Sequence, residues 1–295
     1  MTGIENNSDS LWVTSNYVTR YNAQGQEIEN KNALGIFSSA LYGFGQSLPK
    51  AVAANAQQRE VFYENFDDRN FNRLCATTDV CDPDLFTLKE GSAGALVTGA
   101  AHSGNYAFEL KGTMDLTTRV HNMQHKAGIY LSNNPLGEYF KKYIPELYSG
   151  GFSPMPYKRH IVSVWVKHSD LKSNDPGFLM TVYGVQLDFK RKATVEGWKL
   201  MEAEFTTNNQ ESLTLRLAKT LDGIILDDLR VFPFDAQMKS YTYDDKTMRL
   251  MAELDENNYA TFYEYDDEGT LIRVKKETER GIMTIKESRS AYRKQ

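Results

Sequence analysis

The chain has 295 residues, of which 41% are hydrophobic and 12% aromatic, and its formal net charge is -5. This length predicts two domains or one large all-β domain, and the mild negative charge argues against a protein that binds nucleic acid. No apolar run approaches the roughly 18 residues that cross a membrane, so we expect no transmembrane segment. The chain opens on a polar stretch that is not a signal peptide. If the protein is exported, we expect this chain to be a fragment whose export signal lies elsewhere.

The N-terminal segment predicts a β-hairpin. Apolar and polar positions alternate over residues 10–30, and AQGQ at 23–26 has the composition of a turn. Residues 33–58 then change to small residues, glycines and an Ala-rich run. We expect a loop there, followed by one short helix over residues 50–58.

The middle of the chain predicts a β-sandwich. From residue 61 to 233, apolar runs of 5 to 11 residues are divided by Gly, Pro, Ser, Asn and Asp, which is typical of sandwiches. In RHIVSVWVKH (159–168), Val162, Val164 and Val166 share one face, which should point at the core. Residues 132–157 hold four prolines and predict a long surface loop with one helical turn near 138–143.

A tyrosine-centred hairpin pattern occurs on both sides of this middle region. It is present at 18–32 and 262–276, with a copy lacking its Gly at 240–250. Repeated hairpins build a wall rather than a catalytic pocket. We expect the two flanks to meet in space, with the sandwich inserted between them. Residues 241–268 are acidic and the last 25 are basic, so these charges either pair across neighbouring strands or dock the basic tail on an acidic partner.

Three strings in the middle region carry a resemblance to the galactose-binding-like jelly roll of carbohydrate-binding modules. They are AHSGNYAFEL (101–110), GWKLMEAEFT (197–206) and GIILDDLRVF (223–232). YTYD at 241–244 and YEYD at 263–266 stand 22 residues apart, and the flanks resemble YD-repeat proteins such as rearrangement-hotspot shells and teneurins. About three repeat units are present, too few to close a shell, and Asn22 replaces the preferred Asp.

The whole arrangement resembles the large YD-repeat surface proteins of the Bacteroidetes group, which implies an exported cell-surface or secreted location. The predicted fold class is all-β, a jelly-roll sandwich flanked by YD-repeat-like hairpins. The predicted domains are an N-terminal hairpin and linker (1–58), the sandwich (59–237), and C-terminal hairpins with a basic tail (238–295). The predicted role is structural: docking on a protein partner within a surface assembly. A glycan-binding adhesion module is the alternative.

A structural Ca²⁺ is the first ligand that the jelly-roll resemblance implies. Asp67 or Asp68 and Asp227 would supply carboxylates, and the turn around Ser103 and Asn105 would supply backbone carbonyls. Calcium takes 6 to 8 oxygen ligands and accepts such a mixture. The alternative is that these acids are ordinary turn and strand-end residues.

Glycan binding is the second implication, because such modules use exposed aromatic side chains as platforms for sugar rings. The candidates are Tyr130, Tyr157, Tyr183 and Phe189. Trp165 and Trp198 fit a core better, because a strand tryptophan with apolar neighbours usually packs inward. A sandwich fold alone does not imply a sugar ligand, so a spacer or protein-binding role stays open.

The sequence offers little for catalysis. The five histidines are scattered, HNMQH (121–125) lacks the Glu of a zinc protease, and no G-x-S-x-G or phosphate-binding glycine loop occurs. No local pair of carboxylates indicates glycoside cleavage, so we expect a protein that is not an enzyme. Cys75 and Cys81 are too few for a four-Cys zinc site. They would form a disulfide outside the cell and stay free thiols in the cytosol.

Overall fold

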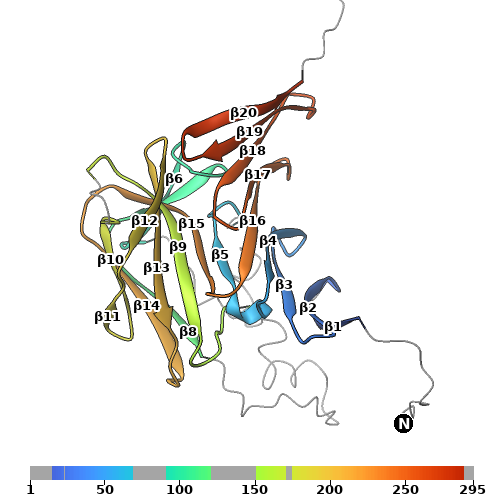
Figure 1. The fold of residues 1–295 in the computed structure, drawn as a ribbon. Coiled ribbons are helices and arrows are strands. Elements are labelled where there is room, and N and C mark those ends of the chain that lie inside the picture. The colour runs from blue at the N-terminus through green and yellow to red at the C-terminus, as the bar shows by residue number, and fades with distance from the viewer. Residues whose placement is uncertain (1–14, 23, 69–90, 121–150, 171–174, 289–295) are drawn as a thin grey trace, which may run out of the picture.

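The computed structural model describes residues 15–22, 24–68, 91–120, 151–170 and 175–288, and these residues form three antiparallel sheets (Figure 1). The predicted all-β class is confirmed. The only helix among the described residues is one 3₁₀ turn, η1 (Gln58–Glu60). None of the described segments is a helix of the length and apolarity that a membrane span requires.

The first sheet has nine strands in the order β1-β2-β3-β4-β16-β17-β18-β19-β20. It is built from both flanks of the chain, since its first four strands precede the sandwich and its last five follow it. The bounds are β1 Asn16–Tyr21, β2 Glu27–Asn32, β3 Phe37–Gly43, β4 Leu48–Ala54, β16 Gln237–Tyr243, β17 Leu250–Leu254, β18 Ala260–Tyr265, β19 Leu271–Thr278 and β20 Gly281–Glu287.

Strands β4 and β16 join the two flanks. Ala54 lies opposite Gln237 and Ala51 opposite Ser240 in an antiparallel register. The two flanks therefore share one sheet, as expected, but the strand that joins them is β4, in the segment expected to be a loop and a helix, and not the predicted hairpin β1–β2. The identity of these hairpins as YD repeats stays a prediction, as do the three domain boundaries.

Five of the seven turns between consecutive strands of the nine-stranded sheet share one local cause. In each of these five, an Asn or Asp side chain accepts hydrogen bonds from backbone N–H groups that follow it, which closes the turn locally; in the β19–β20 turn Thr278 accepts instead. Asn22 Oδ1 accepts from the N–H of Gln26 at 2.8 Å, and Asp266 Oδ1 accepts from the N–H of Thr270 at 2.7 Å. Asn22 thus fills the position where the repeat pattern prefers Asp. The residues in this role are Asn22, Asn32, Asp244, Asp255 and Asp266.

The other two sheets form the sandwich. A four-stranded sheet has the order β11-β10-β14-β8, and a seven-stranded sheet has the order β12-β13-β9-β15-β7-β6 with β5 also paired to β15. The bounds are β5 Phe62–Glu64, β6 Gly94–Thr98, β7 Tyr106–Leu110, β8 Thr113–Arg119, β9 Arg159–Lys167, β10 Phe178–Val182, β11 Val185–Gln186, β12 Lys190–Val195, β13 Trp198–Thr206, β14 Ser212–Lys219 and β15 Ile224–Pro233.

The main core lies between these two sheets. Val162, Val164 and Val166 point into it, as predicted, against residues of the four-stranded sheet such as Leu215 and Met180. Burial of this apolar surface contributes about 25 cal/mol per Å². It is therefore the principal source of stability for the sandwich.

The seven-stranded sheet is buried on its second face as well, which explains why β9 and β15 are nearly continuous runs of buried residues. Trp165 and Trp198 lie on this face, with Tyr259 and Ile282 of the nine-stranded sheet packed against them. Both tryptophans are core residues, as predicted. The molecule thus has three layers, and the seven-stranded sheet is the middle one.

Three sequence predictions differ from the structure. The loop and helix expected over residues 33–58 are wrong: the segment forms β3 and β4, with Ala51 and Ala53 of β4 buried between two partner strands and the sandwich. Strand β8 was not predicted, since TMDLTTR is too polar to stand out. The run at 177–189 is not one strand, because a two-residue turn at Tyr183 and Gly184, both with positive φ, folds β11 back on β10.

Candidate functional site

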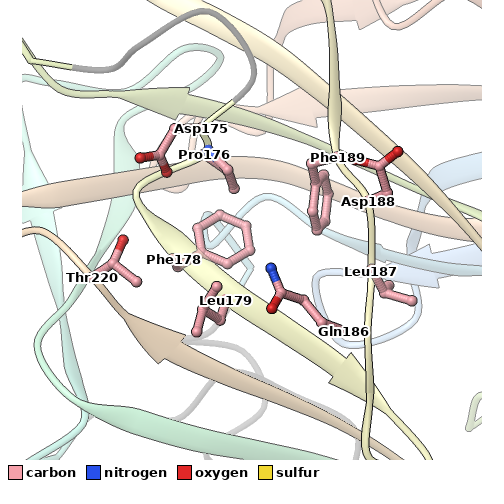
Figure 2. A pocket seen from close by; sticks show the side chains of 9 residues that line it. All are labelled: Asp175, Pro176, Phe178, Leu179, Gln186, Leu187, Asp188, Phe189 and Thr220. Atoms are coloured by element: carbon pink, nitrogen blue, oxygen red, sulfur yellow. The ribbon is translucent and has the colours of Figure 1, made fainter.

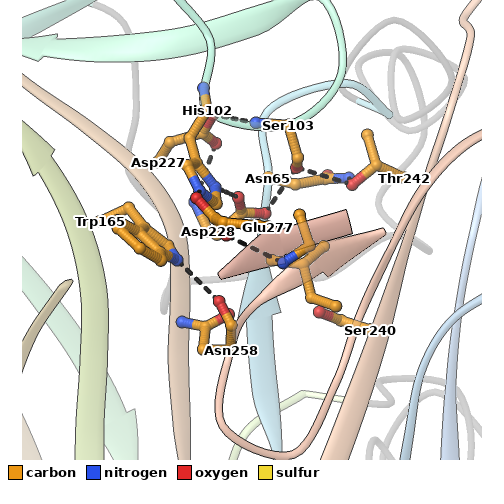
Figure 3. A network of polar contacts seen from close by, with 12 residues as sticks. Asn65, His102, Ser103, Trp165, Asp227, Asp228, Ser240, Thr242, Asn258 and Glu277 are labelled. Atoms are coloured by element: carbon orange, nitrogen blue, oxygen red, sulfur yellow. Dashed lines mark hydrogen bonds and ion pairs between the residues drawn. The ribbon is translucent and has the colours of Figure 1, made fainter. Parts of the chain in front are cut away.

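A buried polar network lies where the sandwich meets the nine-stranded sheet (Figure 3). Its centre is His102, in the turn between β6 and β7. The ring Nδ1 is 2.7 Å from Asp228 Oδ2 on β15, and Nε2 is 3.1 Å from Glu277 Oε1 on β19. One imidazole therefore bridges a carboxylate of the sandwich and a carboxylate of the outer sheet.

Asp228 has three side-chain partners, of which His102 is one. Its Oδ1 accepts hydrogen bonds from the Tyr63 hydroxyl at 2.6 Å and the Ser103 hydroxyl at 2.8 Å. The pairing of β15 with β9 is interrupted between Asp227 and Arg230, and Asp228 has a φ of 49°. This irregularity turns consecutive acidic side chains, which would otherwise alternate across the sheet, into one buried site.

The network makes His102 a cation. Burial lowers the pKa of the imidazole, but its hydrogen bonds to Asp228 and Glu277 outweigh this and raise the pKa to about 9. The ring also stacks on Trp165, with centroids 4.1 Å apart and planes 18° apart. A charged imidazole on an indole face is favourable in the manner of other cation–π contacts. His102 is therefore held by two ion pairs and one aromatic ring.

A second pair of acids lies beside the first. Asp227 Oδ2 accepts from the backbone N–H groups of His102 at 2.7 Å and Ser103 at 3.2 Å. Asp67 Oδ1 accepts from the N–H of Asn105 at 2.8 Å. Burial, reinforced by the neighbouring carboxylates, raises the pKa of both Asp67 and Asp227 well above the usual range. The β6–β7 turn is thus held by carboxylates through its backbone.

Arg230 extends the network toward β16 and β17. Its guanidinium is fully buried and donates to the Ser240 hydroxyl at 2.6 Å, to the Asp255 carbonyl at 2.9 Å and to the Leu254 carbonyl at 3.3 Å. Burial lowers its pKa. A planar fork with five donors suits several carbonyls at once. Arg230 therefore attaches the middle layer to the outer sheet at a second point.

The structure brings the predicted calcium ligands together but occupies most of their oxygens with protein donors. Asp227 accepts three backbone N–H groups, Asp68 pairs with Lys50 at 3.1 Å, and the Ser103 hydroxyl contacts Asp228. Asp67 Oδ2 is the one carboxylate oxygen here that is buried without a partner. Among the described residues, no group of three or more His, Cys, Asp or Glu is placed to hold a metal.

One unpartnered oxygen falls short of the 6 to 8 that Ca²⁺ takes. As they are arranged, these residues do not form a fitting calcium site, and calcium binding stays a prediction.

The described candidates for the glycan platform differ in exposure. Tyr157 is exposed by 70%, Tyr183 accepts a hydrogen bond from the Asn208 N–H at 3.4 Å, and Phe189 is buried. Tyr130, Cys75 and Cys81 lie outside the described residues.

Phe189 lines a cavity of about 430 Å³ on the sandwich (Figure 2). The Phe178 ring stands edge-on to the Phe189 ring, with centroids 5.4 Å apart. Polar side chains complete the lining: Asp175, Gln186, Asp188 and Thr220. Aromatic rings beside carboxylates and an amide are groups that hold a sugar ring and its hydroxyls.

Another cavity, of about 510 Å³, opens between the sandwich and the nine-stranded sheet. Lys167, Trp198 and Phe262 contribute to its walls, and His102 and Glu277 touch its floor. The side chains of these two floor residues are only 2% and 1% exposed, and both ring nitrogens of His102 are taken. With both ring nitrogens paired, the network can hold the sandwich and the nine-stranded sheet together. That the protein is not an enzyme stays a prediction.

Sequence reasoning missed His102, Glu277 and Arg230. Their partners lie far away in the chain, 175 positions in the case of His102 and Glu277, so no local spacing could join them. One signal was present in the sequence: the HSGN turn and the Asp227–Asp228 pair lie in two of the three segments that resemble the jelly roll, 101–110 and 223–232. They mark the same site, which has His102 at its centre.

Comparison with known proteins identifies no relative: no family model matches the chain, and no curated protein matches it.

Proposed function

We propose that this chain is a structural docking module of an exported bacterial surface or secreted assembly, and that it acts without catalysis. Its work is to present the edges of the nine-stranded sheet to partner strands. The observation that supports this is the open sheet: among the described residues, β1 pairs only with β2 and β20 only with β19. Unpaired strand edges recruit further strands.

The occupant we propose for the β20 edge is a strand from a hairpin of the same kind on a partner protein. The sheet is already assembled from hairpins, and most of them are closed by an Asn or Asp turn, as at Asn22 and Asp266. Neighbouring strands are also tied by tyrosines, since the Tyr243 hydroxyl donates to the Pro49 carbonyl at 2.9 Å and the Tyr265 hydroxyl to the Leu250 carbonyl at 3.0 Å. One more hairpin would continue this arrangement.

The side chains of β20 favour an added strand. Met283 is 56% exposed and Ile285 60% exposed. Large apolar side chains on an edge strand lose contact with water when a partner strand covers them. Ile285 falls at a bulge between β19 and β20, a feature by which edges limit indiscriminate pairing.

The test combines cross-linking of the assembly in its native cells with a double variant, Met283→Lys with Ile285→Lys. We expect cross-links from a specific partner at β20 and their loss in the variant, because edge lysines oppose strand addition. Val185→Lys is the matched control: Val185 is 67% exposed on β11, an edge strand of the sandwich. Cross-links that persist in the double variant, or that map to the sandwich, would refute this role.

Glycan binding is the second candidate, supported by the cavity of Figure 2, whose lining includes Phe189 together with Asp175 and Asp188. We expect a glycan array to give hits that Asp188→Ala abolishes, because the carboxylate would accept hydroxyl hydrogens. An array without hits would remove this candidate.

A further inference from the structure

We propose that the 510 Å³ cavity between the sandwich and the nine-stranded sheet binds a carboxylate carried on a ring, with the ammonium of Lys167 as its anchor. The proposal does not depend on docking at β20. The volume lies within the roughly 300 to 1,000 Å³ of small-molecule sites. Its position between two layers is also typical of ligand pockets, which favour such interfaces.

Both layers contribute walls to the cavity. Lys167 ends β9 and Trp198 begins β13 on the sandwich side, while Phe262 of β18 and Ile282 of β20 face them from the nine-stranded sheet. The side chains of Trp198, Phe262 and Ile282 form an apolar wall against which a six-membered ring can lie. A ligand here would contact both layers at once.

The charges of the lining single out Lys167. Glu264 is already paired with Arg273 at 2.8 Å and with Lys275. Glu277 is paired with His102. Among the described residues, Lys167 takes part in no ion pair within 4.0 Å.

Lys167 is also held in place. Its ammonium stands 5.5 Å from the centroid of the Trp198 ring. A cation beside an indole and without an anion is a site for an acidic group, because a charge-assisted hydrogen bond is stronger than a neutral one. Glu196 is the remaining acid of the lining, and it is exposed on the sandwich, where water screens its charge.

Two kinds of molecule share this chemistry: a hexuronic acid and an aromatic carboxylic acid. D-glucuronic acid and phenylacetic acid serve as probes, with D-glucose and 2-phenylethanol as the uncharged counterparts. Binding is followed by calorimetry and by tryptophan fluorescence, since Trp198 lines the cavity. We expect saturable binding of one acid and at least tenfold weaker binding of its uncharged counterpart. The acid that binds shows which of these two kinds of molecule the cavity takes.

Variants of Lys167 decide whether the anchor is correct. Lys167→Met keeps the length of the side chain and should weaken binding about tenfold or more, whereas Lys167→Arg should retain binding. Lys190→Met, on an exposed part of β12, should change nothing. Thermal melts establish that each variant is folded.

Charge reversal gives an independent readout. Lys167→Glu should bind D-glucosamine or 2-phenylethylamine in preference to the acids. The proposal is overturned if neither acid saturates at millimolar concentration, if the uncharged counterpart binds equally well, or if Lys167→Met binds like the parent. The double lysine variant of β20 should leave this binding unchanged, so failure of docking and failure of the cavity are distinguishable.

Discussion

His102 and Glu277 are 175 positions apart in the chain, yet their side chains meet at 3.1 Å between Nε2 and Oε1. The first belongs to a turn of the sandwich and the second to β19 of the outer sheet. Their ion pair, with Asp228 on the other ring nitrogen at 2.7 Å, connects the sandwich to the outer sheet. The contact makes specific predictions about stability.

Glu277→Gln should destabilise the protein by about 3 kcal/mol, because removing one partner of a buried ion pair leaves the other insufficiently compensated. The measurement is chemical denaturation followed by fluorescence of the buried tryptophans. The control is Arg216→Gln, which removes a surface pair with Asp115 and should leave the transition unchanged. Equal behaviour of the two variants would show that the His102 bridge contributes nothing.

Raising the pH should weaken the same bridge. The pKa of His102 is raised to about 9 in the folded protein, from an ordinary value of 6.5. A raised pKa means that the folded state holds the proton more tightly. The stabilisation is therefore complete below pH 6.5 and is lost as the pH rises through 9. Melting temperatures between pH 7 and 10 should fall in the parent and fall less in His102→Gln.

Lowering the pH should act through another histidine. Burial lowers the pKa of His160 to about 4, although its Nδ1 lies 3.0 Å from the Lys158 carbonyl. A lowered pKa means that the unfolded chain binds the proton more readily, so stability should decline from pH 6.5 down to 4. His160→Phe should reduce this loss of stability in acid. It should leave unchanged the loss of stability at high pH that we attribute to His102. A variant with an unchanged acid profile would contradict the assignment.

Gly104→Ala should cost about 2 to 4 kcal/mol, from backbone strain together with overpacking. Gly104 has a φ of 73°, and a Cβ there would lie 2.1 Å from Asp67 Oδ2. Gly45→Ala separates the two causes: Gly45 has a φ of 68° but nothing within 4 Å of the added carbon. Denaturation should show a smaller loss for Gly45→Ala, near 1 kcal/mol. Equal losses would show that the Asp67 contact is irrelevant.

The calcium prediction is tested by melting the protein with and without a chelator. A structural ion would raise the melting temperature by mass action. The protein donors already bound to Asp68 and Asp227 lead us to expect the same temperature in both conditions. A lower temperature in the chelator would instead support an ion at Asp67, and Asp67→Asn would then abolish the difference.

The sequence predicted what depends on local pattern. The alternation of Val162, Val164 and Val166 located the core face of β9, and the turn composition located the hairpins. It failed where tertiary packing overrides propensity, as at Ala51 and Ala53, whose small side chains fit a crowded sheet although they favour a helix in isolation. The site could be predicted only in pieces, because His102 acquires its role from partners on other strands.

The attachment of the insert has a consequence for how the chain folds. Asn55 and Asp235 hydrogen-bond across a separation of 180 residues, beside the pairing of β4 with β16. Closing so long a loop is slow, because the chain loses conformational entropy before the stabilising contacts between its ends have formed. Until the sandwich has folded and placed β16 beside β4, the edge of β4 that pairs with β16 stays unpaired. In that interval one edge of β4 is open to pairing with another chain, which is a route to aggregation.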